Sequence, residues 1–314
     1  MVIAQSSSSA GAALQQMGQA SSAQVKGEIG RAAFQIIARD FSAAVARGKT
    51  AQGAGLARQG IDAWQTLPPD DKKDQFNFAI LLEMRALVDP DPNAVLKALG
   101  EIEAKGNLSN DIQRALVWSR LQLYDRMDNG GSGEDYIRQL AAKGIPSWQV
   151  EYLYPWIKER KDVEQRMKLA RLVRPAVKDQ PEMDRRFAMM LIEDLLTKQD
   201  ATAANEEARA FIKQHPKSGD AWRLLARSSE AVDQPFEADR AWNVITDKAV
   251  PTMSIWWEGM LSRVRIRTKS NRPDEACPLL KQLEKQRQYL PTEFKEQFNT
   301  ARGGAQCATV KVAS

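Results

Sequence analysis

Residues suited to catalysis or metal binding are scarce in this chain. It has one histidine, His215, and two cysteines, Cys277 and Cys307. His215 stands directly before Pro216, which suits the end of a helix, where an imidazole lies near the last carbonyls. A lone histidine and two cysteines without C-x-x-C spacing cannot complete a zinc site. We therefore predict no metal, no cofactor and no Ser-His or Cys-His catalytic pair.

Two short segments partly match ligand-binding loops. In "ARGKTAQG" a phosphate-binding loop would need a second glycine five residues before Gly48, and Ala43 stands there. In "DNGGSGEDY" a calcium loop would need a closing glutamate where Gln139 stands. The first segment is better explained as a helix end capped by Gly48, and the second as a glycine-rich linker. The sequence thus predicts that the chain is not an enzyme.

Apolar residues recur almost everywhere at helical spacing, and alternating runs typical of strands are nearly absent. The segment 28–48 shows this most clearly, with one apolar stripe made of Ile29, Ala33, Ile36, Ile37, Phe41 and Val45. The 314 residues are 43% hydrophobic and 27% charged, an ordinary globular composition. No window approaches the roughly 20 apolar residues of a membrane span. We predict an all-α fold.

Four prolines recur at intervals of 35 residues, and each is followed six positions later by an aromatic residue. The pairs are Pro146/Tyr152, Pro181/Phe187, Pro216/Trp222 and Pro251/Trp257. Proline cannot continue a helix, so it closes the second helix of a hairpin. The aromatic residue then falls in the first turns of the next helix and fills the groove between hairpins. This pattern predicts stacked helical hairpins with a continuous core.

The segment 217–251 resembles a tetratricopeptide repeat. Its first helix has the aromatic, leucine and small residue of that motif at Trp222, Leu225 and Ala226, and its second has Ala238 and Trp242. The resemblance implies an α-α superhelix (solenoid) of tetratricopeptide-like hairpins. It also implies a non-catalytic scaffold for protein–protein interaction. The chain departs from the motif in its period of 35 and in two prolines, Pro155 and Pro175, that are expected to interrupt helices.

The sequence predicts four regions. Residues 1–23 are rich in Ser, Ala, Gln and Gly and are expected to form a flexible N-terminal lead. Residues 24–145 are expected to form irregular helical hairpins, and residues 146–303 tetratricopeptide-like repeats of period 35. Residues 304–314 form a C-terminal tail.

Arginines on two predicted first helices are candidates for a partner-binding groove. Arg223 and Arg227 are four residues apart, and so are Arg263 and Arg267. The resemblance implies that first helices line the inner surface, so these side chains would attract an acidic peptide or a chain terminus. The alternative is an ordinary solvated face.

Aromatic residues in "PSWQVEYLYPWIKER" lie on more than one side of a helix. We expect some of the three candidates Trp148, Tyr154 and Trp156 to be exposed and available to a protein partner. Contact with carbohydrate through such aromatics is an alternative function. Binding of RNA or another polyanion is a further alternative, based on a net charge of +5 and a 35-residue hairpin. However, the polar pair that selects a base in each unit of an RNA-binding repeat does not recur.

The two cysteines could form a disulfide. The last two predicted helices reverse near Pro291, and an antiparallel pair would bring Cys307 close to Cys277. A bonded pair would indicate an oxidising compartment, so that the protein is periplasmic or secreted. Two reduced cysteines and a cytoplasmic protein are the alternative. With a disulfide, the scaffold would suit a cell-envelope assembly for secretion, pilus formation or polysaccharide export.

Overall fold

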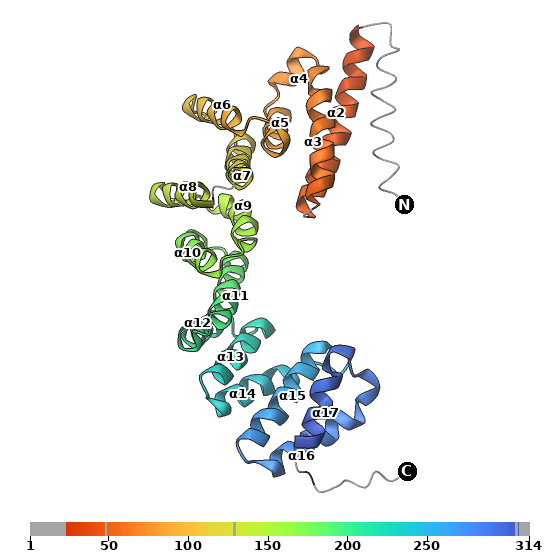
Figure 1. The fold of residues 1–314 in the computed structure, drawn as a ribbon, viewed down its shortest axis with the longest axis vertical. Helices are drawn as coiled ribbons and strands as arrows, with labels where there is room; N and C mark the ends of the chain where they lie inside the picture. The colour runs from red at the N-terminus through yellow and green to blue at the C-terminus, as the bar shows by residue number, and fades with distance from the viewer. Residues whose placement is uncertain (1–22, 48, 128–129, 305–306, 308–314) are drawn as a thin grey trace. The chain divides into compact units, whose positions relative to one another are not determined.

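The computed structural model describes residues 23–47, 49–127, 130–304 and 307. Within these ranges every regular element is a helix. The chain divides into two compact units, Met1–Glu159 and Arg160–Ser314, whose helices are labelled in Figure 1. Along the sequence, the division between the units falls after Glu159, whereas the sequence pattern predicts a boundary after residue 145. The predicted N-terminal lead, the cap at Gly48 and most of the predicted tail lie outside the described residues.

The first unit consists of helices joined by short connections. Their starts follow local signals, since Asp74, Asp91 and Ser109 each accept a hydrogen bond from a first-turn amide, and Pro69 and Pro92 open helices. The helices are α2 (Ala23–Ala46), α3 (Thr50–Gln65), α4 (Pro69–Lys73), α5 (Gln75–Val88), α6 (Pro92–Ala104), α7 (Asn110–Arg126), α8 (Gly130–Lys143) and α9 (Ser147–Lys158).

The core of the first unit lies between successive hairpins. α2 and α3 run side by side, and the buried rings of Phe34, Phe41 and Trp64 pack between them and α5 (Figure 1). α5 packs along α7, where Leu82 and Leu123 are buried. α7 in turn contacts α9. Alternate helices therefore stand next to each other, as expected for stacked hairpins.

The second unit repeats the hairpin with more regular spacing. Its elements are α10 (Val163–Val173), the 3₁₀ turn η1 (Arg174–Val177), α11 (Pro181–Thr197), α12 (Ala201–Gln214), α13 (Gly219–Ala231), α14 (Pro235–Thr246), α15 (Ser254–Lys269), α16 (Pro273–Lys285), the turns η2 (Arg287–Tyr289) and η3 (Thr292–Phe294), and α17 (Lys295–Gly304). The turns inside three hairpins contain a residue with positive φ: Gln199, Asp233 and Asn271. This left-handed residue lets the chain reverse within a few positions.

In the two pairs that contain tryptophan, a hydrogen bond adds to packing as a reason for the six-residue interval between proline and aromatic. The indole Nε1 of Trp222 donates to the Pro216 carbonyl oxygen at 2.9 Å. Trp257 makes the same bond to Pro251 at 2.7 Å and is fully buried. The tryptophan thus satisfies a carbonyl left free where the previous helix has ended, as well as filling the groove between hairpins.

Two expectations about chain interruptions are wrong. The glycine-rich segment is not wholly a linker, because α8 begins at Gly130. A Cβ on Gly133 would lie 2.7 Å from the Trp156 ring, so glycine allows α8 to approach that ring closely. Pro155 does not end a helix either, since α9 continues through it to Lys158. Pro175, in contrast, lies in the 3₁₀ turn that follows α10.

Candidate partner-binding site

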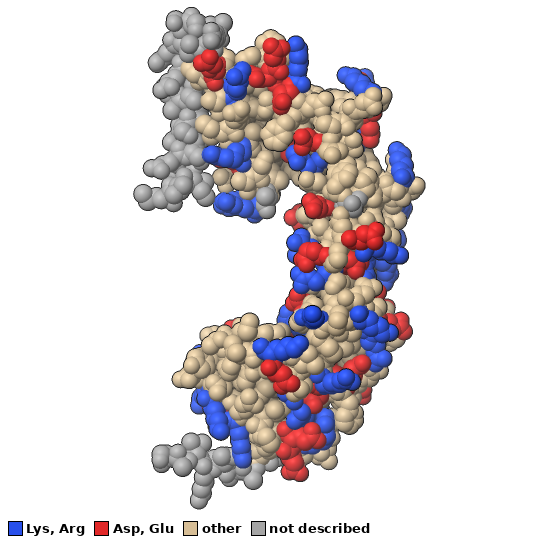
Figure 2. Space-filling view, turned by 180° about the vertical axis from the view of Figure 1, so that it is seen from behind, with Lys and Arg blue, Asp and Glu red and all other residues tan. Residues whose placement is uncertain are grey.

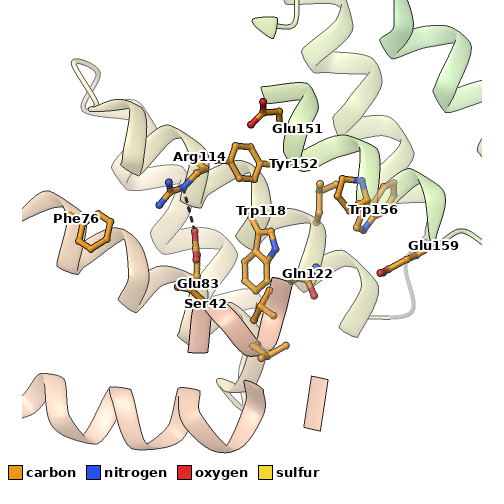
Figure 3. A pocket seen from close by; sticks show the side chains of 14 residues that line it. Ser42, Phe76, Glu83, Arg114, Trp118, Gln122, Glu151, Tyr152, Trp156 and Glu159 are labelled. Atoms are coloured by element: carbon orange, nitrogen blue, oxygen red, sulfur yellow. Dashed lines mark ion pairs between the residues drawn. The ribbon is translucent and has the colours of Figure 1, made fainter. Parts of the chain in front are cut away.

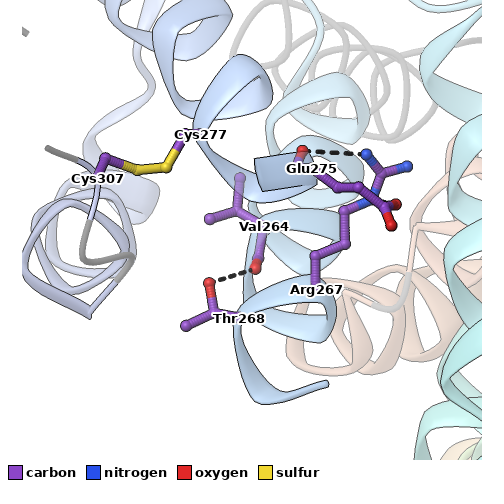
Figure 4. Close-up of a disulfide and its surroundings, with 6 residues drawn as sticks. All are labelled: Val264, Arg267, Thr268, Glu275, Cys277 and Cys307. Atoms are coloured by element: carbon purple, nitrogen blue, oxygen red, sulfur yellow. Dashed lines mark hydrogen bonds and ion pairs between the residues drawn. A yellow bond between two sulfur atoms is a disulfide. The ribbon is translucent and has the colours of Figure 1, made fainter. Parts of the chain in front are cut away.

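Three of the four arginines predicted to line a basic groove are paired with acidic side chains of the second unit. Arg263 on α15 is only 7% exposed. Its Nε lies 3.1 Å from Asp239 on α14, and its Nη1 donates to the Thr246 hydroxyl at 3.0 Å. Arg267 pairs with the same carboxylate at 2.9 Å and contacts Glu275 as well (Figure 4). Both arginines fasten α15 to α14, so the expectation that they face a partner is wrong.

The other two predicted arginines lie on α13. Arg223 pairs with Glu258 of α15 at 2.9 Å, which neutralises it against the next hairpin. Arg227 is exposed. Basic and acidic side chains are interspersed over the described part of the face shown in Figure 2, in each unit. A single exposed arginine in mixed surroundings is a weak attractor for an acidic chain terminus.

One of the three candidate surface aromatics is buried. Trp156 is 4% exposed, and its indole Nε1 donates to Asp125 at 2.9 Å. Of the three candidates, Trp156 is therefore not an exposed aromatic, because α8 covers its ring through Gly133. Trp148 and Tyr154 are half-buried.

The two cysteines are bonded in the structure. Cys277 of α16 joins Cys307, which lies beyond the end of α17 (Figure 4). The bond ties the last helix to its neighbour, where Phe298 is buried against Trp257 with ring centroids 6.3 Å apart. It closes a loop of 30 residues, a length for which a disulfide typically contributes roughly 3 kcal/mol.

A concave surface with several aromatic side chains lies in the first unit. A cavity of about 550 Å³ is lined by side chains of α2, α5, α7 and α9, and Figure 3 shows the side chains that surround it. We call it the first-unit groove. The residues used below are Phe76, Glu83, Arg114, Trp118, Glu151, Tyr152, Trp156 and Glu159.

Aromatic rings form much of the wall of the first-unit groove. Trp118 is partly exposed and is held edge-on against Phe41, with ring centroids 6.4 Å apart. Phe76 is 51% exposed, which is unusual for a large apolar side chain. Tyr152 lies under the Arg114 guanidinium, 5.9 Å from its ring centroid. Rings held by a rigid scaffold offer apolar area to a ligand at little entropic cost.

The charges of the groove are not balanced. Three carboxylates, Glu83, Glu151 and Glu159, line it together with one guanidinium, Arg114. Glu83 points toward Arg114 in Figure 3, but Oε1 and Nε are 3.9 Å apart, beyond hydrogen-bonding distance. Arg114 is shared with Asp111, at 3.6 Å.

The pKa of Glu83 reflects this position. Burial raises it from 4.5 to about 7, Arg114 lowers it only in part, and Asp111 raises it further. The carboxylate side chain is 16% exposed. Its charge is therefore costly at neutral pH, and among the described residues Arg114 offsets that cost only in part. Such a perturbed group in a concave site is typical of a functional position.

Comparison with known proteins identifies the fold of this chain but no family. No protein-family model and no curated protein matches the chain. The crystal structure of the apo form of RapI is similar, with a TM-score of 0.50 and 11% identity over 86% of this chain and 81% of RapI. The chain has a tetratricopeptide-like helical repeat fold. The structure of Pseudomonas aeruginosa PilF has a TM-score of 0.42 at 12% identity, over 87% of this chain and 98% of PilF.

Sequence reasoning did not identify the groove residues of this tetratricopeptide-like chain. One signal was available, because Glu83 and Trp118 are 35 positions apart, the same interval as the prolines downstream. They therefore occupy equivalent places on the neighbouring helices α5 and α7. Upstream of Pro146, however, no proline–aromatic pair marks the repeats, and a glutamate alone does not attract notice.

Neither a metal site nor a membrane helix is present in the described ranges. No three His, Cys, Asp or Glu side chains gather there to hold an ion. None of the described helices has the length and apolar character needed to cross a membrane.

Proposed function

We propose that the chain is a non-catalytic scaffold that binds a partner protein through its first-unit groove. The observation that carries this proposal is the concave surface of about 550 Å³ lined by α2, α5, α7 and α9. It combines the partly exposed rings of Trp118 and Phe76 with charges that the fold leaves unbalanced. Aromatic anchors surrounded by polar groups are typical of protein interfaces.

Two alternatives have less support. A polyanion would meet the carboxylates Glu83, Glu151 and Glu159 in the groove, and they would repel phosphate. In the second unit, three of the four candidate arginines are paired with Asp239 or Glu258, and only Arg227 is exposed without such an ion pair to a described residue. Carbohydrate contact relied in part on Trp156, which is buried. A protein segment is the occupant that best suits both the rings and the carboxylates.

Photo-crosslinking tests the scaffold proposal in cells. A benzophenone amino acid replaces Phe76, at the groove, or Phe236, which is 73% exposed in the second unit and serves as the control. We expect a discrete protein adduct from position 76 and none of the same mass from position 236. The absence of any adduct at position 76 under irradiation, with the protein folded and expressed, would overturn the proposal.

We further propose that the protein works in an oxidising compartment, the periplasm or outside the cell, as part of an envelope assembly. The bond between Cys277 and Cys307 supports this location. Lysis of the protein's own cells under denaturing conditions, in excess mass-tagged maleimide and without reductant, labels every free thiol, and the mass shift of the protein counts them. No titratable thiol is expected. Two free thiols per chain would favour the cytoplasm instead.

A further inference from the structure

We propose that the first-unit groove recognises a lysine or arginine side chain in an apolar segment of its partner, with Glu83 as the receptor carboxylate. This inference rests on the proposed scaffold function and specifies the chemistry of the partner. The groove is an established cavity in the structure, not a surface cluster of charges, and its carboxylates outnumber its single guanidinium.

The first argument is the incomplete pairing of Glu83. Its nearest cation, Arg114, is 3.9 Å away and also serves Asp111, and Glu83 accepts no hydrogen bond from the described side chains or amides. A buried carboxylate normally obtains such partners within its own fold. An incoming ammonium or guanidinium would supply them at short range, which makes a charge-assisted bond.

The second argument is the arrangement around the carboxylate. Trp118 and Tyr152 line the same cavity and can cover the methylene stem of a long basic side chain. Phe76, 51% exposed, offers a contact for an apolar neighbour in the bound segment. Glu151 and Glu159 are exposed at the groove and add attraction for a basic segment. An acidic segment would meet repulsion from all three carboxylates.

A pH dependence follows from the same geometry. A basic side chain binds the ionised form of Glu83, whose pKa is about 7 in the free protein. Affinity should therefore rise roughly tenfold between about pH 6 and about pH 8, as the proton leaves. The charged groups that act on Glu83 are Arg114 and Asp111 of α7. Glu151, Tyr152 and Glu159 line the same cavity from α9 and its end, and α2 contributes only the neutral Ser42 and Val45.

Fluorescence polarisation with labelled peptide pools tests the inference. Each pool has randomised apolar and polar flanks and one fixed central residue, either Lys, Arg, Gln or Glu. We expect the Lys and Arg pools to bind the intact chain at least roughly tenfold more tightly than the Gln and Glu pools. Glu83→Gln should remove this preference and the pH dependence. Glu101→Gln, an exposed change on α6 in the same unit, should leave both unchanged.

The outcomes separate the inference from the scaffold proposal. Equal binding of the Lys and Gln pools, or a preference that survives Glu83→Gln, would overturn the inference. If crosslinks from position 76 persist in that case, the scaffold proposal stands and its partner has another chemistry. Glutamine keeps the size of glutamate, and thermal unfolding of the variant verifies that it folds. Preference for the Glu pool would point to Arg114 as the receptor and also overturn the inference.

Discussion

Two largely but not fully buried carboxylates, one in each unit of this chain, have contrasting surroundings. Asp239 in the second unit receives two guanidiniums, at 3.1 Å and 2.9 Å, and its side chain is 13% exposed. Glu83 in the first unit is 16% exposed, and its single guanidinium stands 3.9 Å away. Similar burial with such different pairing indicates different roles. The first carboxylate joins two helices of the fold, and the second is left for a ligand.

The largest expected effect comes from removing the shared carboxylate. Asp239→Asn would leave Arg263, which is almost fully buried, without a counter-charge and Arg267 with only the more distant Glu275, at 3.8 Å. We expect the free energy of unfolding to fall by about 3 kcal/mol, measured by chemical denaturation. Glu206→Gln, an exposed change on α12, is the control and should be nearly neutral. A loss no larger than that of the control would mean that the cluster does not hold α14 and α15 together.

Glu83→Gln should raise the free energy of unfolding, and the size of this increase should depend on pH. The folded pKa of Glu83, about 7, lies above its ordinary value of 4.5. The protonated form is therefore favoured by folding, and stability is lost as pH rises from about 4.5 through about 7. At about pH 8 the variant should be more stable than the wild type by roughly 3 kcal/mol, and near pH 4 the two should converge. Denaturation curves across this range that remain parallel would contradict the comparison.

Two glycine-to-alanine substitutions test whether the wall of the first-unit groove needs a glycine at position 133. Gly133→Ala would place a methyl group 2.7 Å from Trp156, a ring in the groove wall, and should cost about 1–2 kcal/mol. Gly100→Ala, on α6, meets open space and should stabilise by about 0.5–1 kcal/mol. The thermal unfolding midpoints of both variants show whether each substitution stabilises or destabilises the protein. If both stabilise, Gly133 is not needed for close approach.

The smallest effects concern the proline–tryptophan bonds of the second unit. Trp257→Phe would lose the hydrogen bond to Pro251 in a buried place, at a cost of about 1–2 kcal/mol. Trp222→Phe loses the equivalent bond in a more exposed place and should cost less. Equal losses in chemical denaturation would show that ring size, and not the bond to the carbonyl, sets the interval of six.

The helices of the second unit were predictable because their signals are local. Proline, capping residues and apolar spacing act within one or two turns of the helix that they begin or end. The roles of side chains were less predictable. Spacing puts Arg263 and Arg267 on one face, but it does not indicate that Asp239 of the preceding helix lies opposite them. The burial of Trp156 was not predictable, because the approach of α8 depends on Gly133.

The first-unit groove could not be predicted from the sequence, for a related reason. Its lining residues come from α2, α5, α7 and α9, and extend from Ser42 to Glu159. Their convergence depends on how successive hairpins stack, and no regular proline marks those hairpins upstream of Pro146. Composition also concealed the site, since a net charge of +5 directed attention to arginines and away from three carboxylates.

The central claim is that Glu83 carries a charge which the fold leaves uncompensated and which a basic partner segment completes. A carbon-13 NMR titration of the side-chain carboxyls in the intact chain, assigned with Glu83→Gln, tests it most directly. The account predicts a midpoint of about 7 for Glu83 in the free protein, falling when a lysine-centred peptide is added. A free-protein midpoint near 4.5, the ordinary value, or a midpoint unmoved by bound peptide, would contradict it.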